Sequence, residues 1–371
     1  MAIVVASASA LAMGQEAYPM ERVVIAAGEG EGTVSISPRA LVVAAGRLMI
    51  TRGESDPYAG SGFHLFEARA GLESSFVESV DLVMVARLDR APGLLEAYAS
   101  IHPWSHGLSV EVGLFAIPLS VEHDVEASSR QILETPVTRT VTGLDRLLGL
   151  AISYESDKRV SARVGAWGIP EDGADPSAFS AFAAAGRIWV DFAGAGAEPG
   201  KPPAASAGTG ASAGFSLLYR RDPDLPLLAT GGEVDLDTLA IGPQAALTRG
   251  PFSTVVEVLY VREWTAGGEG RAARLAYPDV DGVAGYLQAG IFAIPGSLEI
   301  SARFGAMDGD LGVAGWAVRP VVAVTWYILG NNLKLQAEYH SQVPVSEPFP
   351  DGSLGASPVI HSGLLALRAA L

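Results

Sequence analysis

Apolar and polar positions alternate along most of the chain, in stretches of about ten residues separated by Gly, Pro, Asp or Asn. In residues 77–89, for example, Leu82 and Met84 fall on one face of an extended chain, and Asp81 and Arg87 fall on the other. Side chains of a strand point alternately to its two faces. Each such stretch therefore predicts a strand with one apolar face and one polar face.

Breaking the chain at its turn residues gives about sixteen strands. The predicted ranges are 39–51, 63–76, 78–90, 94–103, 108–117, 146–156, 159–169, 181–193, 211–221, 236–248, 252–264, 280–293, 296–307, 315–329, 332–343 and 358–371. Short breaks such as Asp157-Lys158 and Gly330–Asn332 predict tight turns at one end, because Asn and Gly accept a left-handed backbone. The Gly/Ala/Pro/Ser tract Gly194–Gly210 is predicted to be a loop at the opposite, external end.

Composition points to a membrane location for these strands. Hydrophobic residues make up 49% of the chain although its formal net charge is -16. Beyond the N-terminus, no apolar run reaches the roughly 18 residues that a membrane-spanning helix needs. Backbone in lipid must satisfy its own hydrogen bonds, which leaves a closed barrel as the spanning structure. The predicted fold class is all-β, a transmembrane antiparallel β-barrel of about sixteen strands formed by residues 39–371 as a single domain.

The N-terminus indicates export. Residues 1–14 contain a short apolar run followed by small residues, which is interpreted as a signal peptide without its positively charged first region. Residues 15–38 are interpreted as a flexible N-terminal segment. Together with the predicted barrel, these features predict localisation in a bacterial outer membrane.

One connection is much longer than its neighbours. Residues 119–143 carry mixed acidic and basic groups and precede a clean strand, and a loop of this length usually has a function. We predict that it folds into the lumen and narrows it; an exposed loop with solvated charges is the alternative. Its candidate constriction residues are Glu122, His123, Asp124, Arg130 and Arg139, and the candidates on the wall are Arg69, Arg87, Arg163 and Arg187.

Other chemistry finds little support in the sequence. There is no cysteine, and basic residues are scattered singly, which argues against a thiolate metal site and a nucleic-acid partner. Residues 210–214 match the Gly-x-Ser-x-Gly nucleophile motif but lack the strand before it and the helix after it. His102 and His106 have no third ligand nearby for zinc. No catalytic residue, metal or cofactor is predicted.

Within residues 113–141, Gly113 and Pro118 fall at the end of a predicted strand, and Ser128-Ser129-Arg130 fall in the long segment that follows. This pattern resembles the phosphate-selective porin O and P family, in which a strand ends in a Gly-x-Phe-x-x-Pro-like motif before a long segment with a Ser-Ser-Arg-like core. Further similarity to the first two strands and the penultimate hairpin of that family covers nearly the whole chain. The residues that carry the match are Gly113, Phe115 shifted by one, Pro118, Ser128, Ser129, Arg130, Gly46-Arg47-Leu48, Phe66–Arg69 and Val324–Tyr339.

The resemblance implies a sixteen-stranded outer-membrane barrel, often trimeric, that passes small anions such as phosphate by diffusion. This chain departs from that pattern, because its predicted inward positions mix both signs of charge, which predicts weak selectivity. The inward positions are Arg69, Arg87, Arg163, Arg187, Arg220, Arg303 and Arg319 together with Glu67, Glu73, Asp81, Glu96, Asp191, Glu257 and Glu299.

The sequence as a whole predicts a porin for passive diffusion of small hydrophilic solutes or ions, with no chemical step. Its expected partners are outer-membrane lipid, the permeating solute and two further copies in a homotrimer. Two alternatives stay open: a plugged barrel that serves as a structural or adhesive anchor, and a secreted soluble β-protein that binds glycans.

Overall fold

The structure is a computed structural model, and its side chains and backbone are described within defined ranges. These are residues 23–26, 33–52, 59–76, 79–89, 92–103, 107–121, 129–138, 144, 146–156, 159–170, 179–193, 209–226, 233–266, 279–308, 316–345 and 359–370.

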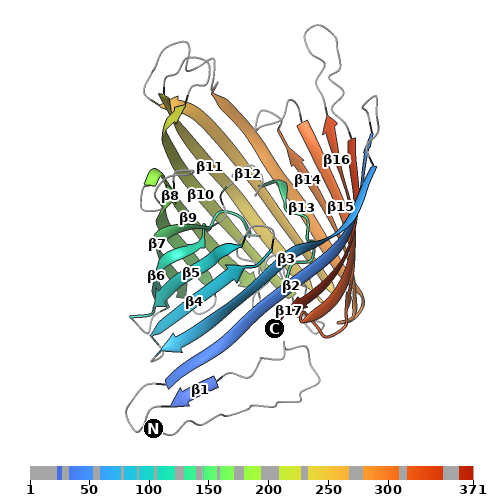
Figure 1. Cartoon of the computed structure of the whole chain (residues 1–371). Helices are drawn as coiled ribbons and strands as arrows, with labels where there is room; N and C mark the ends of the chain where they lie inside the picture. Colours follow the sequence, from blue (N-terminus) through green and yellow to red (C-terminus); the bar gives the residue numbers. More distant parts are fainter. Residues whose placement is uncertain are drawn as a thin grey trace.

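Sixteen strands, β2 to β17, form a closed antiparallel barrel (Figure 1). Each strand pairs with the next along the chain, and β17 pairs with β2 from Ala370↔Leu41 to Val359↔Arg52, which closes the ring. The short β1 (Val23–Ala26) pairs with the start of β2. The barrel strands are β2 (Thr33–Arg52), β3 (Ala59–Phe76), β4 (Val80–Arg87), β5 (Gly93–Ile101), β6 (Leu108–Ala116), β7 (Arg146–Ser156), β8 (Val160–Pro170), β9 (Phe179–Ala193), β10 (Thr209–Pro226), β11 (Glu233–Arg249), β12 (Phe252–Ala266), β13 (Val280–Ile294), β14 (Leu298–Met307), β15 (Trp316–Tyr327), β16 (Leu333–Val345) and β17 (Val359–Ala370).

The predicted strands correspond one to one with this order, and the barrel class is confirmed. The predicted range 146–156 coincides with β7, whereas β2 begins at Thr33 instead of residue 39. The interpreted signal peptide, residues 1–14, lies outside the described residues.

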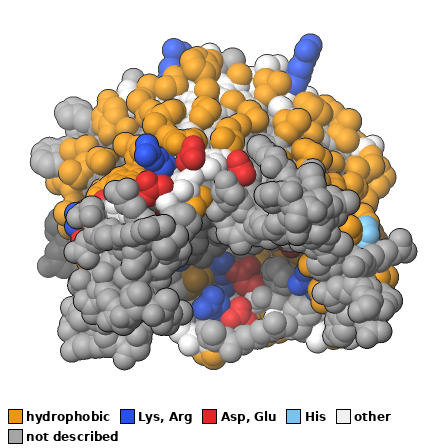
Figure 2. Space-filling model, turned by 90° about the horizontal axis from the view of Figure 1, so that it is seen from above, with side chains coloured by type: hydrophobic (Ala, Val, Ile, Leu, Met, Phe, Trp, Pro, Cys, Tyr) orange, Lys and Arg blue, Asp and Glu red, His pale blue; other side chains and the backbone are white. Residues whose placement is uncertain are grey.

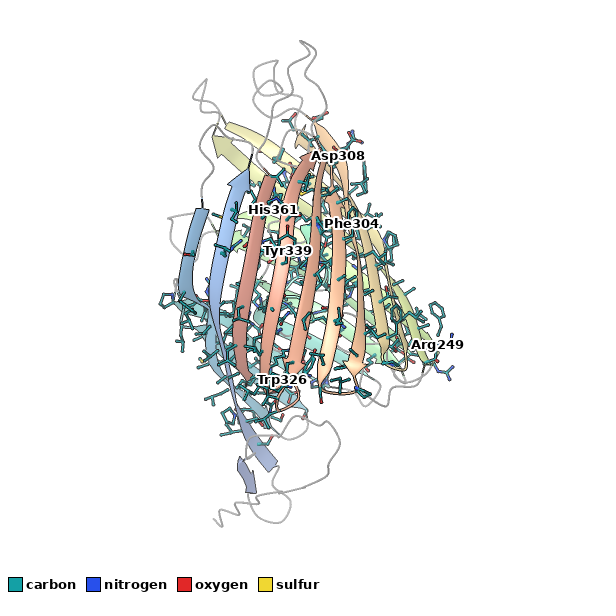
Figure 3. The ribbon with its side chains drawn as sticks, turned by 90° about the vertical axis from the view of Figure 1, so that its right-hand side faces the viewer. Arg249, Phe304, Asp308, Trp326, Tyr339 and His361 are labelled. Carbon is teal, nitrogen blue, oxygen red and sulfur yellow. The ribbon has the colours of Figure 1, made fainter. Side chains whose placement is uncertain are left out.

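Alternation separates an apolar outer face from a largely polar inner face. On β13, Leu287 points outward and is 55% exposed, whereas its neighbour Gln288 points inward and is 1% exposed. Outward side chains such as Phe304 and Trp326 are exposed around the outside of the barrel (Figure 3). Seen from above, hydrophobic side chains cover much of the wall, and basic and acidic side chains lie inside the hollow (Figure 2). Tyr327 also points inward, where it is buried and its hydroxyl donates a hydrogen bond to Glu299.

The tight turns lie at one end of the barrel. Gly250, Gly296 and Gly330 take positive φ angles of 56, 67 and 56° in the turns after β11, β13 and β15, a backbone that glycine adopts without strain. Most of the tract Gly194–Gly210 lies outside the described residues, but the strand end after it is at this same end of the barrel, because Thr209 pairs with Arg249 directly beside the Gly250 turn. The prediction that it lies at the opposite, external end is therefore wrong.

Candidate functional site: the barrel lumen

The described parts of the long connection, residues 117–121 and 129–138, lie against the inner face of the barrel. We call them the lumen segment. Leu119 is packed in one apolar cluster with Phe115, Leu218 and Leu259 of the wall. Further along, Val137 packs with Ala284, Met307 and Ala317 of β13, β14 and β15. Similar clusters hold Val121, Ile132 and Leu133. Burial of these side chains gives the lumen segment a hydrophobic attachment to the wall.

Glu257 of β12 anchors the first part of the lumen segment. Its carboxylate accepts hydrogen bonds from Ser120 Oγ at 3.0 Å and from the Val121 backbone N–H at 2.9 Å. Next to it, Gln244 Nε2 of β11 donates to the Leu119 carbonyl oxygen at 2.7 Å. Glu257 is fully buried, so these donors replace the water that its charge would otherwise need.

Glu338 of β16 anchors the second part. Its two carboxylate oxygens accept from the backbone N–H groups of Leu133 and Glu134. Wall arginines bind the carbonyl oxygens of the same stretch: Arg303 donates to Glu134 O, and Arg368 donates to Arg130 O at 2.8 Å. The lumen segment is thus held on β11 to β17 by charged side chains that bind its backbone, and such hydrogen bonds are stronger than neutral ones.

The inner face of β2 to β8 has a different electrostatic pattern. Most of its arginines pair with a carboxylate on the same strand, the neighbouring strand or the next strand but one, as in Arg146 of β7 with Glu96 of β5 at 2.7 Å. The pairs differ in exposure: the side chains of Arg39 and Glu73 are 38% and 35% exposed, whereas those of Arg146 and Glu96 are 10% and 19% exposed. The other described pairs are Arg69–Glu67, Arg87–Asp89 and Arg163–Glu111.

The four wall arginines among the predicted candidates all lie on the inner face. Arg69, Arg87 and Arg163 are in ion pairs, and Arg187 of β9 donates to the Ser120 carbonyl oxygen of the lumen segment at 3.4 Å. Arg130 belongs to the lumen segment, and its carbonyl oxygen binds wall cations. The remaining candidates, Glu122, His123, Asp124 and Arg139, lie outside the described residues.

Sequence reasoning missed the polar row of β16. Lys334, Gln336, Glu338 and His340 occupy every second position and all face inward. The alternation within the predicted strand 332–343 was the signal that would have found them. Gln131 and Gln244 carried no comparable signal, because a single glutamine in a loop or strand indicates no partner.

Two buried tryptophans on the inner wall lie close to glycines of neighbouring strands. An alanine methyl at Gly214 would come within 2.1 Å of Trp189 Cε3, and one at Gly149 within 2.5 Å of Trp167 Cδ1. Trp189 also packs with Val121 of the lumen segment. The glycines therefore give both rings room beside the wall.

Gly214→Ala is expected to destabilise the barrel by about 1–3 kcal/mol, because the added methyl forces the Trp189 ring off the wall. The measurement is the midpoint of denaturant unfolding in lipid vesicles, followed by tryptophan fluorescence. Gly363→Ala is the matched control, since its methyl would meet no atom within 4 Å. Equal midpoints for both variants would contradict the role of Gly214.

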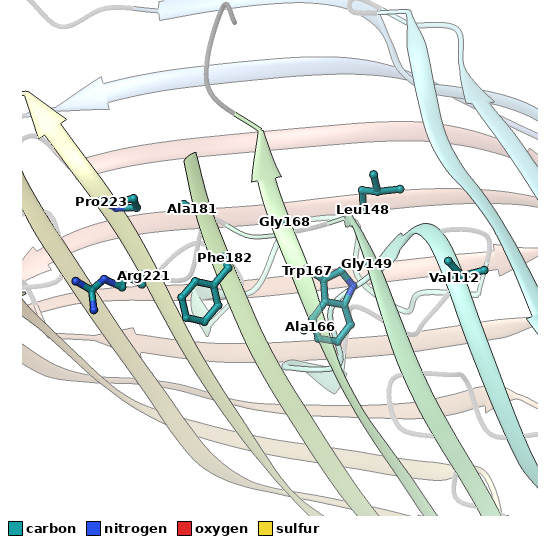
Figure 4. Close-up of a pocket in the computed structure, with 10 residues that line it drawn as sticks. All are labelled: Val112, Leu148, Gly149, Ala166, Trp167, Gly168, Ala181, Phe182, Arg221 and Pro223. Atoms are coloured by element: carbon teal, nitrogen blue, oxygen red, sulfur yellow. The ribbon is translucent and has the colours of Figure 1, made fainter. Parts of the chain in front are cut away.

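A groove of about 740 Å³ lies on the outside of β6 to β10 and not in the lumen (Figure 4). Its lining includes the outward side chains of Val112, Leu148 and Phe182, with Arg221 at one edge. Arg221 is paired with Asp235 at 2.5 Å. The groove is part of the apolar outer face.

Within the described residues, no group of three His, Asp or Glu side chains is arranged to hold a metal ion. No helix in that part of the chain is long and apolar enough to cross a membrane. The Gly210–Gly214 motif lies inside β10, so it does not form the strand-to-helix turn of a nucleophile elbow. His102 contacts Asp81 at 2.9 Å, and His106 lies outside the described residues.

A closed sixteen-stranded antiparallel barrel with a charged interior and an apolar exterior is the architecture of porin-like proteins. Comparison with solved structures agrees. OmpT of Vibrio cholerae superimposes with a TM-score of 0.61 at 13% identity, over 93% of this chain and 99% of OmpT. The anion-selective porin from Comamonas acidovorans gives 0.60 at 12%, over 91% and 100%. OprB of Pseudomonas putida gives 0.58 at 10%, over 91% and 94%.

These likenesses show the fold: a porin-like barrel of the bacterial outer-membrane type. No protein-family model matches the sequence, and no curated protein matches it either. The structural matches therefore support the broader porin-like fold and not the O and P family in particular.

Proposed function

We propose that this protein is an outer-membrane porin for passive diffusion of small hydrophilic solutes or ions. The observation that carries the proposal is the closed barrel with charged side chains inside and exposed apolar side chains outside. A barrel of this size is wide enough to enclose an aqueous channel. The exposed apolar wall argues against the soluble glycan-binding alternative, since it would lie in water.

The solute path runs along the part of the inner face where Arg39 of β2, Glu73 of β3 and Arg87 of β4 lie. These three side chains are 38%, 35% and 45% exposed to solvent. On the other side, Glu257, Glu299 and Arg368 are each at most 1% exposed beneath the lumen segment. The lumen segment thus narrows the channel from one side, and its residues form the constriction together with the paired charges of the facing wall.

Selectivity between anions and cations is expected to be weak. Each of the described arginines Arg39, Arg69, Arg146 and Arg163 has a carboxylate partner on the same side of the lumen. Paired charges cancel most of each other's field beyond about 10 Å at physiological salt. A preference for phosphate is implied by the resemblance to the O and P family alone. The paired charges do not support it.

The purified protein is expected to give stepwise conductance increases in planar bilayers. In asymmetric potassium chloride the reversal potential should stay close to zero, because the lining charges are paired. A folded, inserted protein without conductance steps would favour the plugged anchor instead. A large reversal potential would contradict weak selectivity while leaving the channel intact.

The barrel is proposed to assemble as a homotrimer with the outer face of β4 to β6 at the subunit contact. These strands have eight, nine and nine residues, whereas β10 has eighteen. About 9–11 residues of tilted strand are needed to cross the hydrocarbon core. The wall formed by these short strands is therefore the side expected to pack against a neighbouring subunit. One structure of the similar Vibrio cholerae OmpT is a trimer form.

A further inference from the structure

We propose that Gln131 is a positioning residue that fixes the lumen segment against β12 to β16 and thereby sets the width of the channel. The inference rests on the proposed function, because channel width matters only if solutes pass. Gln131 belongs to the lumen segment and is 1% exposed. It was not among the candidate constriction residues.

The side-chain amide of Gln131 binds three strands at once. Its Nε2 donates to Ser253 Oγ of β12 at 2.8 Å and to Glu299 Oε1 of β14. Its Oε1 accepts from Gln288 Nε2 of β13 at 2.8 Å. An amide supplies two donors and an acceptor, and both kinds of group are used here.

The backbone of Gln131 adds a fourth strand. Its carbonyl oxygen accepts from Gln336 Nε2 of β16 at 2.8 Å and lies 3.5 Å from Ser301 Oγ of β14. The preceding carbonyl, Arg130 O, accepts from Arg368 Nη1 of β17. Two consecutive residues thus connect the lumen segment to β12, β13, β14, β16 and β17.

The wall leaves a space for this side chain at Gly290 of β13. A methyl there would lie 2.5 Å from Gln131 Nε2 and 2.7 Å from Glu299 Oε1. The missing side chain at Gly290 is therefore what lets the amide reach Glu299. Because protein interiors are closely packed, filling this space would displace Gln131.

Losing the Gln131 amide would leave buried polar groups without partners, which is unfavourable in a protein interior. A carboxylate at this position would face Glu299 with like charge and no proton to donate. The lumen segment would then leave the wall and move toward the open side, where Arg39 and Glu73 face the solute path.

The test is an exchange of charge between two partners. Gln131→Glu alone is expected to lower single-channel conductance about twofold and to raise open-channel noise. The double variant Gln131→Glu with Glu299→Gln restores one amide and one carboxylate at the contact, so it is expected to regain wild-type conductance. Gly290→Ala should act like Gln131→Glu without any change of charge, with Gly363→Ala as the matched control.

A second readout does not depend on conduction. Trypsin should cleave after Arg130 faster in folded Gln131→Glu than in the wild type, and the double variant should again be protected; mass spectrometry identifies the cut. Heat-modifiable mobility on gels confirms that each variant forms a barrel. Wild-type conductance and protection in Gln131→Glu, or failure of the double variant to recover, would overturn the role of Gln131. Absence of conductance in the wild type would refute the channel alone.

Discussion

Val164→Arg should destabilise the folded barrel by about 2–4 kcal/mol, because it places a charge on the lipid-facing wall near the middle of a strand. Val164 lies on the outward face of β8 and is 61% exposed. The measurement is the free energy of unfolding in lipid vesicles, with insertion followed by heat-modifiable mobility.

The control lies on the same strand and faces the lumen. Ser161 has the opposite orientation on β8, beside the inward carboxylate of Glu155 with which it is paired across the strands. Ser161→Arg should change the unfolding free energy by less than about 1 kcal/mol, since a water-filled lumen solvates the new charge. If both variants lost the same free energy of unfolding, the assignment of the outer face of β8 to lipid would be contradicted.

Removal of the lumen segment should have the largest effect on conduction. Ala116 and Arg146 are paired at the end of β6 and the start of β7, so a short Gly/Ser turn can replace residues 119–143 without separating the strands. Conductance should rise several-fold, about two- to fivefold, because the inner face of β11 to β17 becomes open to water. The planar-bilayer recording that tests the wild type measures this change.

Two outcomes of that deletion would show whether the lumen segment limits conductance or is needed for assembly. A barrel that folds and conducts no better than the wild type would show that the lumen segment does not limit the channel. Loss of heat-modifiable folding would point to a role in assembly, and the milder Glu338→Gln variant then tests the same attachment. Glu338→Gln removes one acceptor of the Leu133 and Glu134 backbone bonds while retaining the rest of the wall.

Period-two alternation was enough to predict the barrel strands, because the outward and inward faces meet solvents as different as lipid and water. For the segment 159–169, the alternating Val164 and Arg163 gave the correct faces of β8. The error at Gly194–Gly210 came from judging a loop by its length. Counting would have avoided it: the tract follows the eighth predicted strand, as 157–158 follows the sixth, so both connections lie at one end.

The contacts of the lumen segment were beyond such reasoning. Gln131 meets Ser253, Gln288 and Glu299, which are adjacent only because of the register among three strands. Alternation gives the face of each residue but leaves the stagger between neighbouring strands open. The sequence therefore predicted an inward course for the long connection but could not predict which wall residues its described parts contact.

The seam between β2 and β17 joins the most distant parts of the barrel sequence. Arg47 Nε of β2 donates to Ser362 Oγ of β17 at 2.9 Å, across 315 positions of the chain. Until this seam forms, the growing sheet has two free edges whose backbone groups find no partner in hydrocarbon. Stable insertion is therefore all-or-none. An incomplete sheet is unstable in the bilayer, and closing the seam stabilises all of the strands at once.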